Sequence, residues 1–456
     1  MVQALTARVQ ELEAQLTKNS TNSSKPPSSD MPGTRPVQEK KRGKRRKRGG
    51  QRGHKAHFAR VPEHVDRTRR HRARACEHCH ADLAGAKETG LCARHYVYEL
   101  PEIRPIVTEH QCLEVRCLEC GKVTTASLPA EVPSGQYGPS VQAMTALLRG
   151  ELRQSVRQTS CVMTQVMHVP MSTGMVAKIQ DQVSCALEAP FVEALKHAQA
   201  SDRVHADETG WRQDRKKAWL WVAVAGLVTV FLVRTCRNTK AAKELLGEAF
   251  RGILNSDRLA SYNWIDSIRR QFCWSHLKRD FKSFLDYDAD SKRMGEQLLC
   301  QTRRMFRLWH RVRDGTLPRT EFQLAAKPVR RKIIALLEEG GGLSCAKVAG
   351  MCKQILKQKA ALFTFIDVER VEPTNNAAER AVRFAVLMRK GCFGSDSATG
   401  SRFIERFLTV RATLRSQNRD LYAYLKAACL AAHRGVPSPS ILPNLGNVEA
   451  QFPLAA

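Results

Sequence analysis

Three observations predict that this sequence folds as a multidomain α/β protein. The 456 residues allow about three domains, at roughly 150 residues each. From residue 201 onward, short apolar runs and helical periodicity follow one another in the order strand, hairpin, helix, strand. Helical patterns fill most of residues 131–200 and 289–365, on either side of that order. We therefore expect an α/β core with a helical insertion, preceded by smaller modules.

The charge of the chain indicates a polyanionic partner. Lys and Arg number 74 against 44 Asp and Glu, which gives a net charge of +30, and the pI is about 9.9. Nucleic acid is the first candidate and an anionic membrane surface the second. The longest apolar run, residues 218–233, is interrupted by Gly226 and Thr229 and is too short to span a membrane comfortably. It favours two strands around a turn.

The cysteine content and the first residues predict a cytoplasmic protein. Fifteen cysteines, an odd number scattered along the chain, fit reduced thiols better than a disulfide framework. The opening MVQALTARVQELEAQ lacks the basic and then apolar order of a signal peptide.

Residues 1–18 predict a short coiled coil. The apolar side chains that recur here at steps of three and four are Val2, Leu5, Val9, Leu12 and Leu16. Two heptads are marginal alone, so an amphipathic helix docked elsewhere fits the pattern equally well.

Residues 19–60 predict an unstructured linker and a basic arm. The linker is rich in Ser and Pro, and residues 40–60 hold eleven Lys or Arg and no acid. Such a run repels itself until phosphates neutralise it, although a solvated tail is the alternative. The predicted DNA contacts of the arm are Lys40, Lys41, Arg42, Lys44, Arg45, Arg46, Lys47, Arg48, Arg52 and Lys55.

Residues 61–130 predict a zinc-binding module. Two Cys-x-x-Cys pairs supply four thiolates for a tetrahedral structural Zn²⁺ site: Cys76, Cys79, Cys117 and Cys120. The 37 residues between the pairs include a β-rich stretch, residues 95–116, that we expect to fold as a hairpin and return the second pair to the first. A redox pair is the weaker alternative. Nearby side chains that offer a replacement ligand are His78, His80, His110 and Cys112.

Residues 131–200 predict a helical region with two helices split by HVP at 168–170. Ser172 or Thr173 is placed to cap the second helix. A DNA-binding helix-turn-helix and a plain helical connector explain this pattern equally well.

Two acids follow the short apolar runs of the predicted sheet. Asp207 and Asp257 each come at the predicted end of a strand, and neighbouring strands would bring their carboxylates together. A third acid, Glu379, lies in the first turns of a helix that Thr374 or Asn375 is placed to cap. For Asp207 the alternative is an ordinary turn. For Glu379 it is an exposed helix pair with Arg383.

Together the three acids predict a magnesium site. Carboxylate oxygens are the ligands of a hard ion, and two Mg²⁺ ions roughly 3.5–4 Å apart activate a nucleophile and stabilise the leaving oxygen in phosphodiester chemistry. We expect Glu208 to face away from Asp207. Arg383 and Lys390 share a helix face with Glu379 and are predicted to hold DNA phosphate.

Motifs along nearly the whole chain resemble those of insertion sequence 66 family transposases, which are DDE recombinases. They are NSSKPPSSD, GGQRGH, the two cysteine pairs, HADETGWR, SDRLASYNW, FCWSHLKRDF, EPTNNAAER and RKGCFGSDSATGSRFIERFLTVRATLRSQ. One departure is KAH at 55–57, where the resemblance leads us to expect a glycine. The resemblance implies a ribonuclease H-like catalytic core with the triad Asp207, Asp257 and Glu379. It also implies cleavage at element ends, strand transfer into target DNA, a homo-oligomer, and accessory proteins of the same element as partners.

The resulting domain prediction divides the chain into seven parts, one of them in two pieces. They are a coiled coil (1–18), a linker and basic arm (19–60), a zinc module (61–130), a helical region (131–200), a catalytic domain in two pieces (201–288 and 366–433), a helical insertion (289–365) and a C-terminal tail (434–456). Two rival functions remain, a stand-alone nuclease with the same acids and a DNA-binding regulator whose catalytic centre has decayed.

Overall fold

The computed structural model describes residues 61–443 apart from Cys92, Ala130, Glu131 and Ser134, together with Val9 and Glu13, which are helical and exposed. The rest of the predicted coiled coil, the linker and all the predicted DNA contacts from Lys40 to Lys55 lie outside the described residues. So does the tail after residue 443.

The chain forms two compact units, each considered by itself. One comprises residues 35–104, and the other comprises residues 1–34 and 105–456. The larger unit holds two sheets. Its small sheet pairs β1 (Glu114–Arg116) with β2 (Val123–Thr125).

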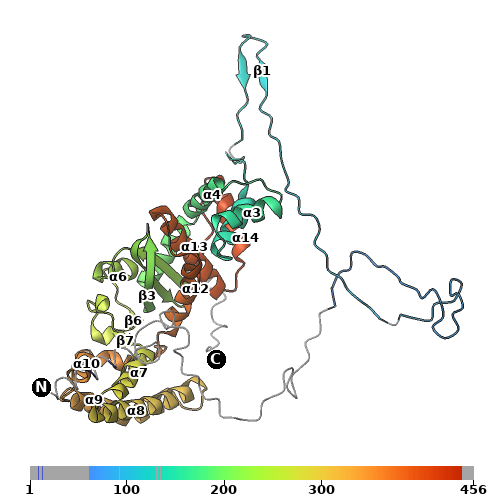
Figure 1. Ribbon diagram of the computed structural model, residues 1–456. Coiled ribbons are helices and arrows are strands. Elements are labelled where there is room, and N and C mark those ends of the chain that lie inside the picture. Colours follow the sequence, from blue (N-terminus) through green and yellow to red (C-terminus); the bar gives the residue numbers. More distant parts are fainter. Residues whose placement is uncertain are drawn as a thin grey trace. The chain divides into compact units, whose positions relative to one another are not determined.

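A five-stranded mixed sheet forms the centre of the larger unit (Figure 1). Its strands are β3 (Arg203–Gln213), β4 (Lys216–Ala225), β5 (Val228–Arg234), β6 (Ile253–Ser256) and β7 (Arg270–Phe272). The strand order is β5-β4-β3-β6-β7, in which β3, β6 and β7 run parallel and β4 and β5 form antiparallel pairs. Gly226 takes up the positive φ of 59° in the turn between β4 and β5. The predicted pair of strands around a turn is therefore confirmed.

Helices precede, interrupt and follow this sheet. Before it come α2 (Pro139–Gly150), α3 (Val156–Gln165), α4 (Thr173–Ala186) and α5 (Glu188–Ala200). Between its strands come α6 (Thr239–Leu246) and the short 3₁₀ helix η2 (Ala260–Tyr262), and α7 (Trp274–Ser283) follows β7 directly. The predicted insertion holds α8 (Ala289–Arg313), α9 (Arg319–Gly340) and α10 (Ala346–Leu356), and α11 (Thr364–Asp367) crosses its predicted end at residue 365. The chain continues with α12 (Asn376–Cys392), α13 (Ala398–Ser416) and α14 (Leu421–His433).

The two helices predicted on either side of the HVP segment are observed, and so is the predicted cap of the second helix. Helices α3 and α4 flank the HVP segment, and the Ser172 side chain caps α4 by accepting a hydrogen bond from the backbone N–H of Met175. Val176 and Ile179 of α4 are buried in the same hydrophobic cluster as the sheet. These helices therefore share the core of the sheet.

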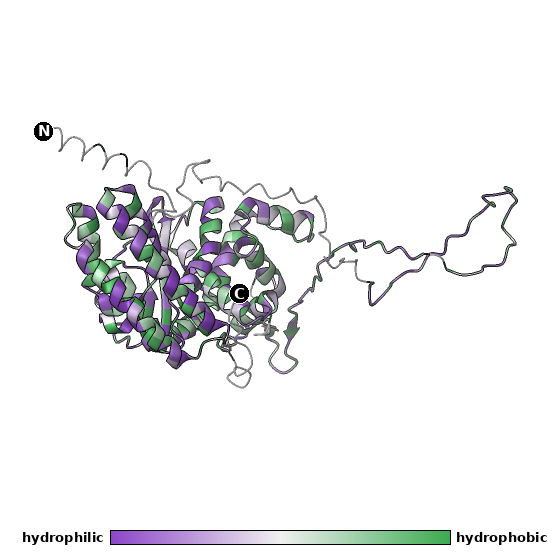
Figure 2. Cartoon of the chain, turned by 90° about the horizontal axis from the view of Figure 1, so that it is seen from below, coloured by the Kyte–Doolittle hydropathy of each residue, from purple (hydrophilic) through white to green (hydrophobic). Residues whose placement is uncertain are grey.

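Two hydrophobic cores lie side by side in the larger unit. The first joins the sheet to α2, α4, α6, α12, α13 and α14, and it includes the fully buried Trp221. The second joins α7 to the helices of the insertion through residues such as Phe281, Phe322 and Phe363. Figure 2 shows hydrophobic and hydrophilic residues alternating along these helices, as expected of helices that bury one side. Within the described part of the chain, no helix combines the length and the apolar character needed to cross a membrane.

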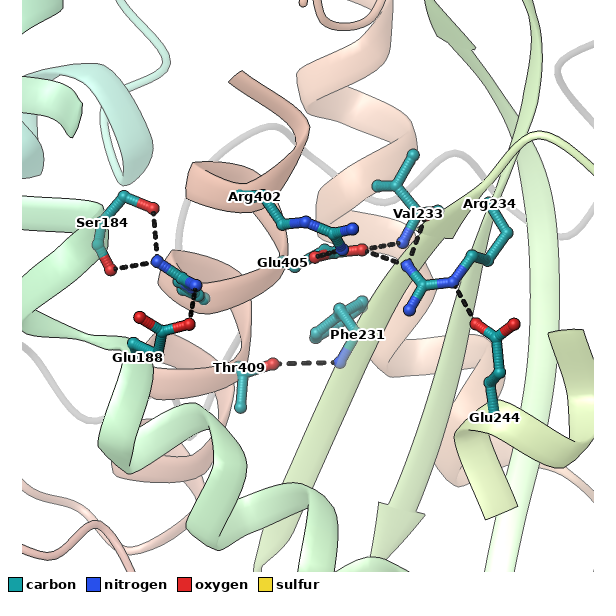
Figure 3. A network of polar contacts seen from close by, with 10 residues as sticks. Ser184, Glu188, Phe231, Val233, Arg234, Glu244, Arg402, Glu405 and Thr409 are labelled. Carbon is teal, nitrogen blue, oxygen red and sulfur yellow. Dashed lines mark hydrogen bonds and ion pairs between the residues drawn. The ribbon is translucent and has the colours of Figure 1, made fainter. Parts of the chain in front are cut away.

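Helix α13 covers the exposed edge of the sheet at β5 (Figure 3). Backbone N–H groups of Thr229, Phe231 and Val233 donate to the side chains of Thr413, Thr409 and Glu405 at 3.0, 3.0 and 2.7 Å. Acceptor side chains four residues apart on α13 thus face backbone donors two residues apart on β5. An edge strand with satisfied donors does not pair with another chain, so α13 closes the sheet.

Candidate active site

The register of the sheet brings Asp207 and Asp257 together. Arg203 pairs with Ile253 and His205 with Asn255, so continuing the same offset by two residues aligns Asp207 with Asp257. Neighbouring strands were predicted for the two acids, and this is confirmed. The prediction that Asp207 ends a strand is wrong, because β3 continues through it to Gln213 in a hairpin with β4. Asp207 lies instead where the parallel pairing with β6 stops.

Buried hydrogen bonds fix the backbone of Asp257. The Arg270 guanidinium, which is fully buried, donates to the Asp257 carbonyl at 3.2 Å. The Ser256 hydroxyl donates to the same carbonyl at 2.8 Å, and the backbone N–H of Leu259 donates to the Asp257 carboxylate at 2.9 Å. The carboxylate therefore has a defined position before any ligand binds.

Helix α12 carries Glu379 in its first turn, as predicted. Asn375 occupies the N-cap position but makes no side-chain cap, which corrects the predicted capping role. Its amide instead donates to the carbonyl of Ala206 at 2.7 Å, and its side-chain oxygen lies 3.2 Å from Nδ1 of His205. This side chain thereby joins α12 to β3 on the face that also bears Asp207.

Glu379 pairs with His276 rather than with Arg383. Its Oε1 lies 3.5 Å from His276 Nδ1 and 3.7 Å from Cys273 Sγ. Arg383 is exposed, so the alternative of a simple Glu379–Arg383 helix pair is not the arrangement seen. Of the other acids near this helix, Asp367 pairs with Arg330 at 3.0 Å.

Crowded carboxylates raise one another's proton affinity. Burial raises the pKa of Asp207 well above its usual range, and the charges of Glu208, Asp257 and Glu379 raise it further. Burial and the charge of Asp257 raise the pKa of Glu208 to about 7. Burial lowers the pKa of His205 to about 4, so this histidine is neutral at pH 7.

Glu208 has partners that sequence reasoning missed. Arg237 donates to its carboxylate at 2.5 Å, and the Tyr262 hydroxyl donates at 3.3 Å. Strand alternation puts Glu208 on the opposite face of β3 from Asp207, in accord with the expectation that it faces away. Arg237 also stacks on the ring of Trp219, 4.8 Å from its centroid. No spacing rule links these residues, which meet only through the fold.

The acids of this region carry negative charge that acts on one another. Asp207, Glu208 and Asp257 interact electrostatically with one another, and Glu379 adds a fourth negative charge near Asp207. Arg237 compensates part of this charge by pairing with Glu208. Carboxylate oxygens are the donors that Mg²⁺ prefers. The carboxylates of Asp207, Asp257 and Glu379 would have to close in around such an ion, because among the described residues only Cys273, His276 and Glu379 hold potential ligand atoms within 4.8 Å of one another.

Exposed basic residues lie on two helices of the larger unit, α12 and α8. Arg383 and Lys390 of α12 are exposed, as their predicted role requires. A second basic surface, which we call the α8 arginine face, was not predicted. Between Glu296 and Asp314 the chain holds no acid. The exposed arginines of α8 in this stretch are Arg303, Arg304, Arg307, Arg311 and Arg313. The run of arginines was visible in the sequence, but only the helix places them on a surface.

The two cysteine pairs have the same backbone geometry. In the first, Cys76 N–H donates to the Ala81 carbonyl at 2.9 Å, and His80 has a φ of 59°. In the second, Cys117 N–H donates to the Lys122 carbonyl at 2.8 Å, and Gly121 has a φ of 68°.

Backbone N–H groups point at the first sulfur of each pair. Those of Cys79 and His78 lower the pKa of the Cys76 thiol, and those of Cys120 and Glu119 do the same for Cys117. Both turns therefore favour thiolates, the form that binds metal.

The predicted hairpin between the pairs is wrong. Residues 95–113 form no strand within the described chain, and the only part of the predicted stretch in a strand is β1, which pairs with β2 across the second cysteine pair. The alternation of apolar residues over 96–107 lacks a partner strand, and several of these side chains, such as Ile106, are almost fully exposed.

Comparison with known proteins identifies relatives of this chain. A profile of the Transposase IS66 family matches residues 134–402, more than half of the chain, and a profile of a family of unknown function (DUF6444) matches residues 1–60. The uncharacterized protein y4qI of Sinorhizobium fredii is 24% identical over 306 residues, which cover 60% of this chain and 56% of that protein. The uncharacterized protein y4hP of the same organism is 25% identical over 347 residues, which cover 68% of this chain and 62% of that protein. The match thus spans about three fifths of each relative's length. The extent of the first match places the chain in the IS66 family of transposases.

Proposed function

We propose that this chain is a DNA transposase that binds the ends of its element and catalyses metal-dependent phosphodiester cleavage and strand transfer. The observation that carries the proposal is the cluster of Asp207, Asp257 and Glu379, brought from β3, the end of β6 and α12. The mixed sheet with its acids in matching register supports a ribonuclease H-like catalytic core. Membership of the transposase family supports DNA as the substrate.

The reaction exchanges one phosphorus–oxygen bond for another. Two Mg²⁺ ions held by the three carboxylates would supply an activated nucleophile and charge stabilisation at neutral pH. In cleavage, water forms the new bond to phosphorus and the 3′ oxygen leaves, taking up a proton. In strand transfer, that 3′-hydroxyl loses its proton, attacks a target phosphodiester and expels another 3′ oxygen.

The protein contributes position and charge to these steps. Arg270 holds the backbone of Asp257, and Asn375 holds α12 against β3. Arg383 and Lys390, both exposed, would bind DNA phosphates, and the exposed arginines of the α8 arginine face would add further phosphate contacts. The arm from Lys40 to Lys55 adds charge for binding without sequence preference. A homo-oligomer and accessory proteins of the same element complete the proposed assembly.

The cysteine pairs are proposed to hold one structural zinc through Cys76, Cys79, Cys117 and Cys120. The matching turns and the lowered thiol pKa of Cys76 and Cys117 support this role. A structural zinc would fix a module that otherwise has few buried apolar side chains.

The decisive experiment supplies the purified protein with labelled element-end DNA, an unlabelled target duplex and Mg²⁺. We expect nicks at the element ends and labelled strands joined to the target, both absent with Asp257→Asn. Cleavage without joined products would indicate a stand-alone nuclease. Binding of the ends without any cleavage would indicate a regulator, and either result would overturn the proposal.

A further inference from the structure

Cys273, His276 and Glu379 form a compact set of three different ligand atoms. Cys273 directly precedes α7, His276 lies in the first turn of α7, and Glu379 lies in the first turn of α12. The thiol sulfur, an imidazole nitrogen and a carboxylate oxygen all lie within 4.8 Å of one another. Among the described residues, no other group of three or more potential metal ligands has its ligand atoms this close together. The proposed transposition chemistry uses only Glu379 from it.

Two of the three separations between these atoms match a tetrahedral ion, and the third is within 4.8 Å. Ligands about 2.0–2.3 Å from a zinc ion at tetrahedral angles lie roughly 3.3–3.7 Å from one another. The observed separations are 3.5 Å from Glu379 Oε1 to His276 Nδ1 and 3.7 Å from the same oxygen to Cys273 Sγ. Side chains therefore need little movement to enclose an ion.

Burial and the charge of Glu379 raise the pKa of the Cys273 thiol to about 11, so an ion has to displace the thiol proton when it binds. Three other features of the surroundings favour a cation. His276 Nδ1 is buried and makes no hydrogen bond, although buried polar atoms normally make one; it only faces Glu379 Oε1 at 3.5 Å. Cys273 Sγ accepts the backbone N–H of Asn375 at 3.2 Å, as a metal-bound thiolate would. Asp257 and Asp280 add negative charge around His276, and Arg279 opposes it. The side chains of His276 and Glu379 remain 19% and 33% exposed, so an ion has access.

We propose that Cys273, His276 and Glu379 bind a divalent cation of the zinc class, and that this ion inhibits DNA cleavage by drawing Glu379 away from magnesium. Sulfur and imidazole ligands select zinc over the hard Mg²⁺ ion. Binding forms the sulfur–metal bond and releases the thiol proton to the buffer. The binding site stands on geometry alone, whereas the inhibition rests on the proposed function.

The binding test compares metal uptake by the whole protein and its variants. Wild type should bind one more equivalent of Zn²⁺ than Cys273→Ser or His276→Gln. With Co²⁺ as the probe, wild type should show a thiolate-to-cobalt absorption that Cys273→Ser lacks. Both variants keep the four cysteines of the zinc module, so the difference reports only this site. Cys352→Ser is the matched control, because Cys352 is a fully buried thiol on α10 outside the cluster. Circular dichroism and thermal melting establish that each variant is folded.

The inhibition test adds Zn²⁺ to Mg²⁺-supported cleavage of end DNA. We expect at least tenfold inhibition of wild type and of Cys352→Ser, and little inhibition of whichever cluster variant retains cleavage. Equal zinc uptake and equal cobalt spectra for wild type and both folded cluster variants would overturn the site. Extra zinc uptake without inhibition would overturn the inhibitory role. Extra uptake by a protein that never cleaves DNA would leave the site standing and contradict only the proposed function.

Discussion

The side-chain amide of Asn375 donates a hydrogen bond to the carbonyl oxygen of Ala206 at 2.7 Å. Ala206 directly precedes Asp207, and the backbone N–H of Glu379 donates to the carbonyl of Asn375 at 3.1 Å. One buried amide thus fixes the strand that carries one acid against the helix that carries another. Asn375 contacts a third element as well, because its backbone N–H donates to Cys273 Sγ at the start of α7.

Asn375→Ala should reduce Mg²⁺-dependent cleavage by roughly 100-fold, since small misplacements of catalytic groups cost about that much. It should also lower the free energy of unfolding by about 1–3 kcal/mol, because the Ala206 carbonyl loses its side-chain donor. Affinity for end DNA should stay nearly unchanged. Asn376→Ala is the control, as that neighbour is exposed on the same helix. Wild-type cleavage by Asn375→Ala would show that α12 holds its place without this bond.

The sequence predicted the acids better than their surroundings. Asp207 and Asp257 are 50 residues apart, the offset at which β3 and β6 pair, so apolar runs ahead of each acid were enough to bring them together. The length of β3 was missed because its hairpin turns at Asp214 and Arg215, both with positive φ and neither a glycine. The contacts of Glu208 with Arg237 and of Glu379 with His276 join distant segments that no local periodicity connects.

The stability of the metal-free protein should fall as pH rises, through the buried acids. Burial and Asp257 raise the pKa of Glu208 from its usual 4.5 to about 7. Between these values the folded state holds a proton that the unfolded state releases, so stability is greatest below the lower value and is lost as pH approaches the upper one.

Unfolding by denaturant at pH 5 and at pH 7.5 measures this loss of stability. The decrease in unfolding free energy should be about 1–3 kcal/mol larger in wild type than in Glu208→Gln, which cannot ionise. Glu338→Gln, at an exposed position on α9, should behave as wild type. Added Mg²⁺ should raise the melting temperature at pH 7.5 more than at pH 5, because it binds the ionised carboxylates. An identical pH dependence in wild type and Glu208→Gln would contradict the raised pKa.

Cys117→Ser should remove one zinc ion per chain from the purified protein. Backbone N–H groups lower the pKa of the Cys117 thiol in the same way as that of Cys76, as expected if each is the first ligand of its pair. Loss of one thiolate should also weaken binding of end DNA, if the module helps to hold the DNA. Cys161→Ser, an exposed cysteine on α3, is the control. Metal analysis without chelator decides the matter, and a zinc content unchanged by Cys117→Ser would exclude this cysteine as a ligand.

The α8 arginine face should contribute to DNA affinity through phosphates. Replacing Arg303 and Arg307 together by Ala should lower the slope of log affinity against log salt by about 2, if each contacts one phosphate. The loss should be the same for element-end and unrelated duplexes, because phosphate contacts carry no sequence information. Lys426→Ala, at an exposed position on α14, should leave the slope unchanged. Equal slopes for wild type and the double variant would show that this face does not touch DNA.

Glu379→Gln should abolish Mg²⁺-dependent cleavage and leave end binding nearly intact, whereas Glu372→Gln should do far less. Both acids lie near the start of α12, but they are held differently. Glu379 stands in the first helical turn, where its charge acts on Asp207. Glu372 lies before the helix, where its backbone carbonyl accepts the Asn255 amide at 2.9 Å, and burial raises the pKa of its carboxyl. Removing a hard anionic ligand should destroy the metal site without disturbing the basic surfaces. Cleavage of end DNA, with binding measured in parallel, distinguishes the two, and near wild-type cutting by Glu379→Gln together with an inactive Glu372→Gln would reassign the third acid.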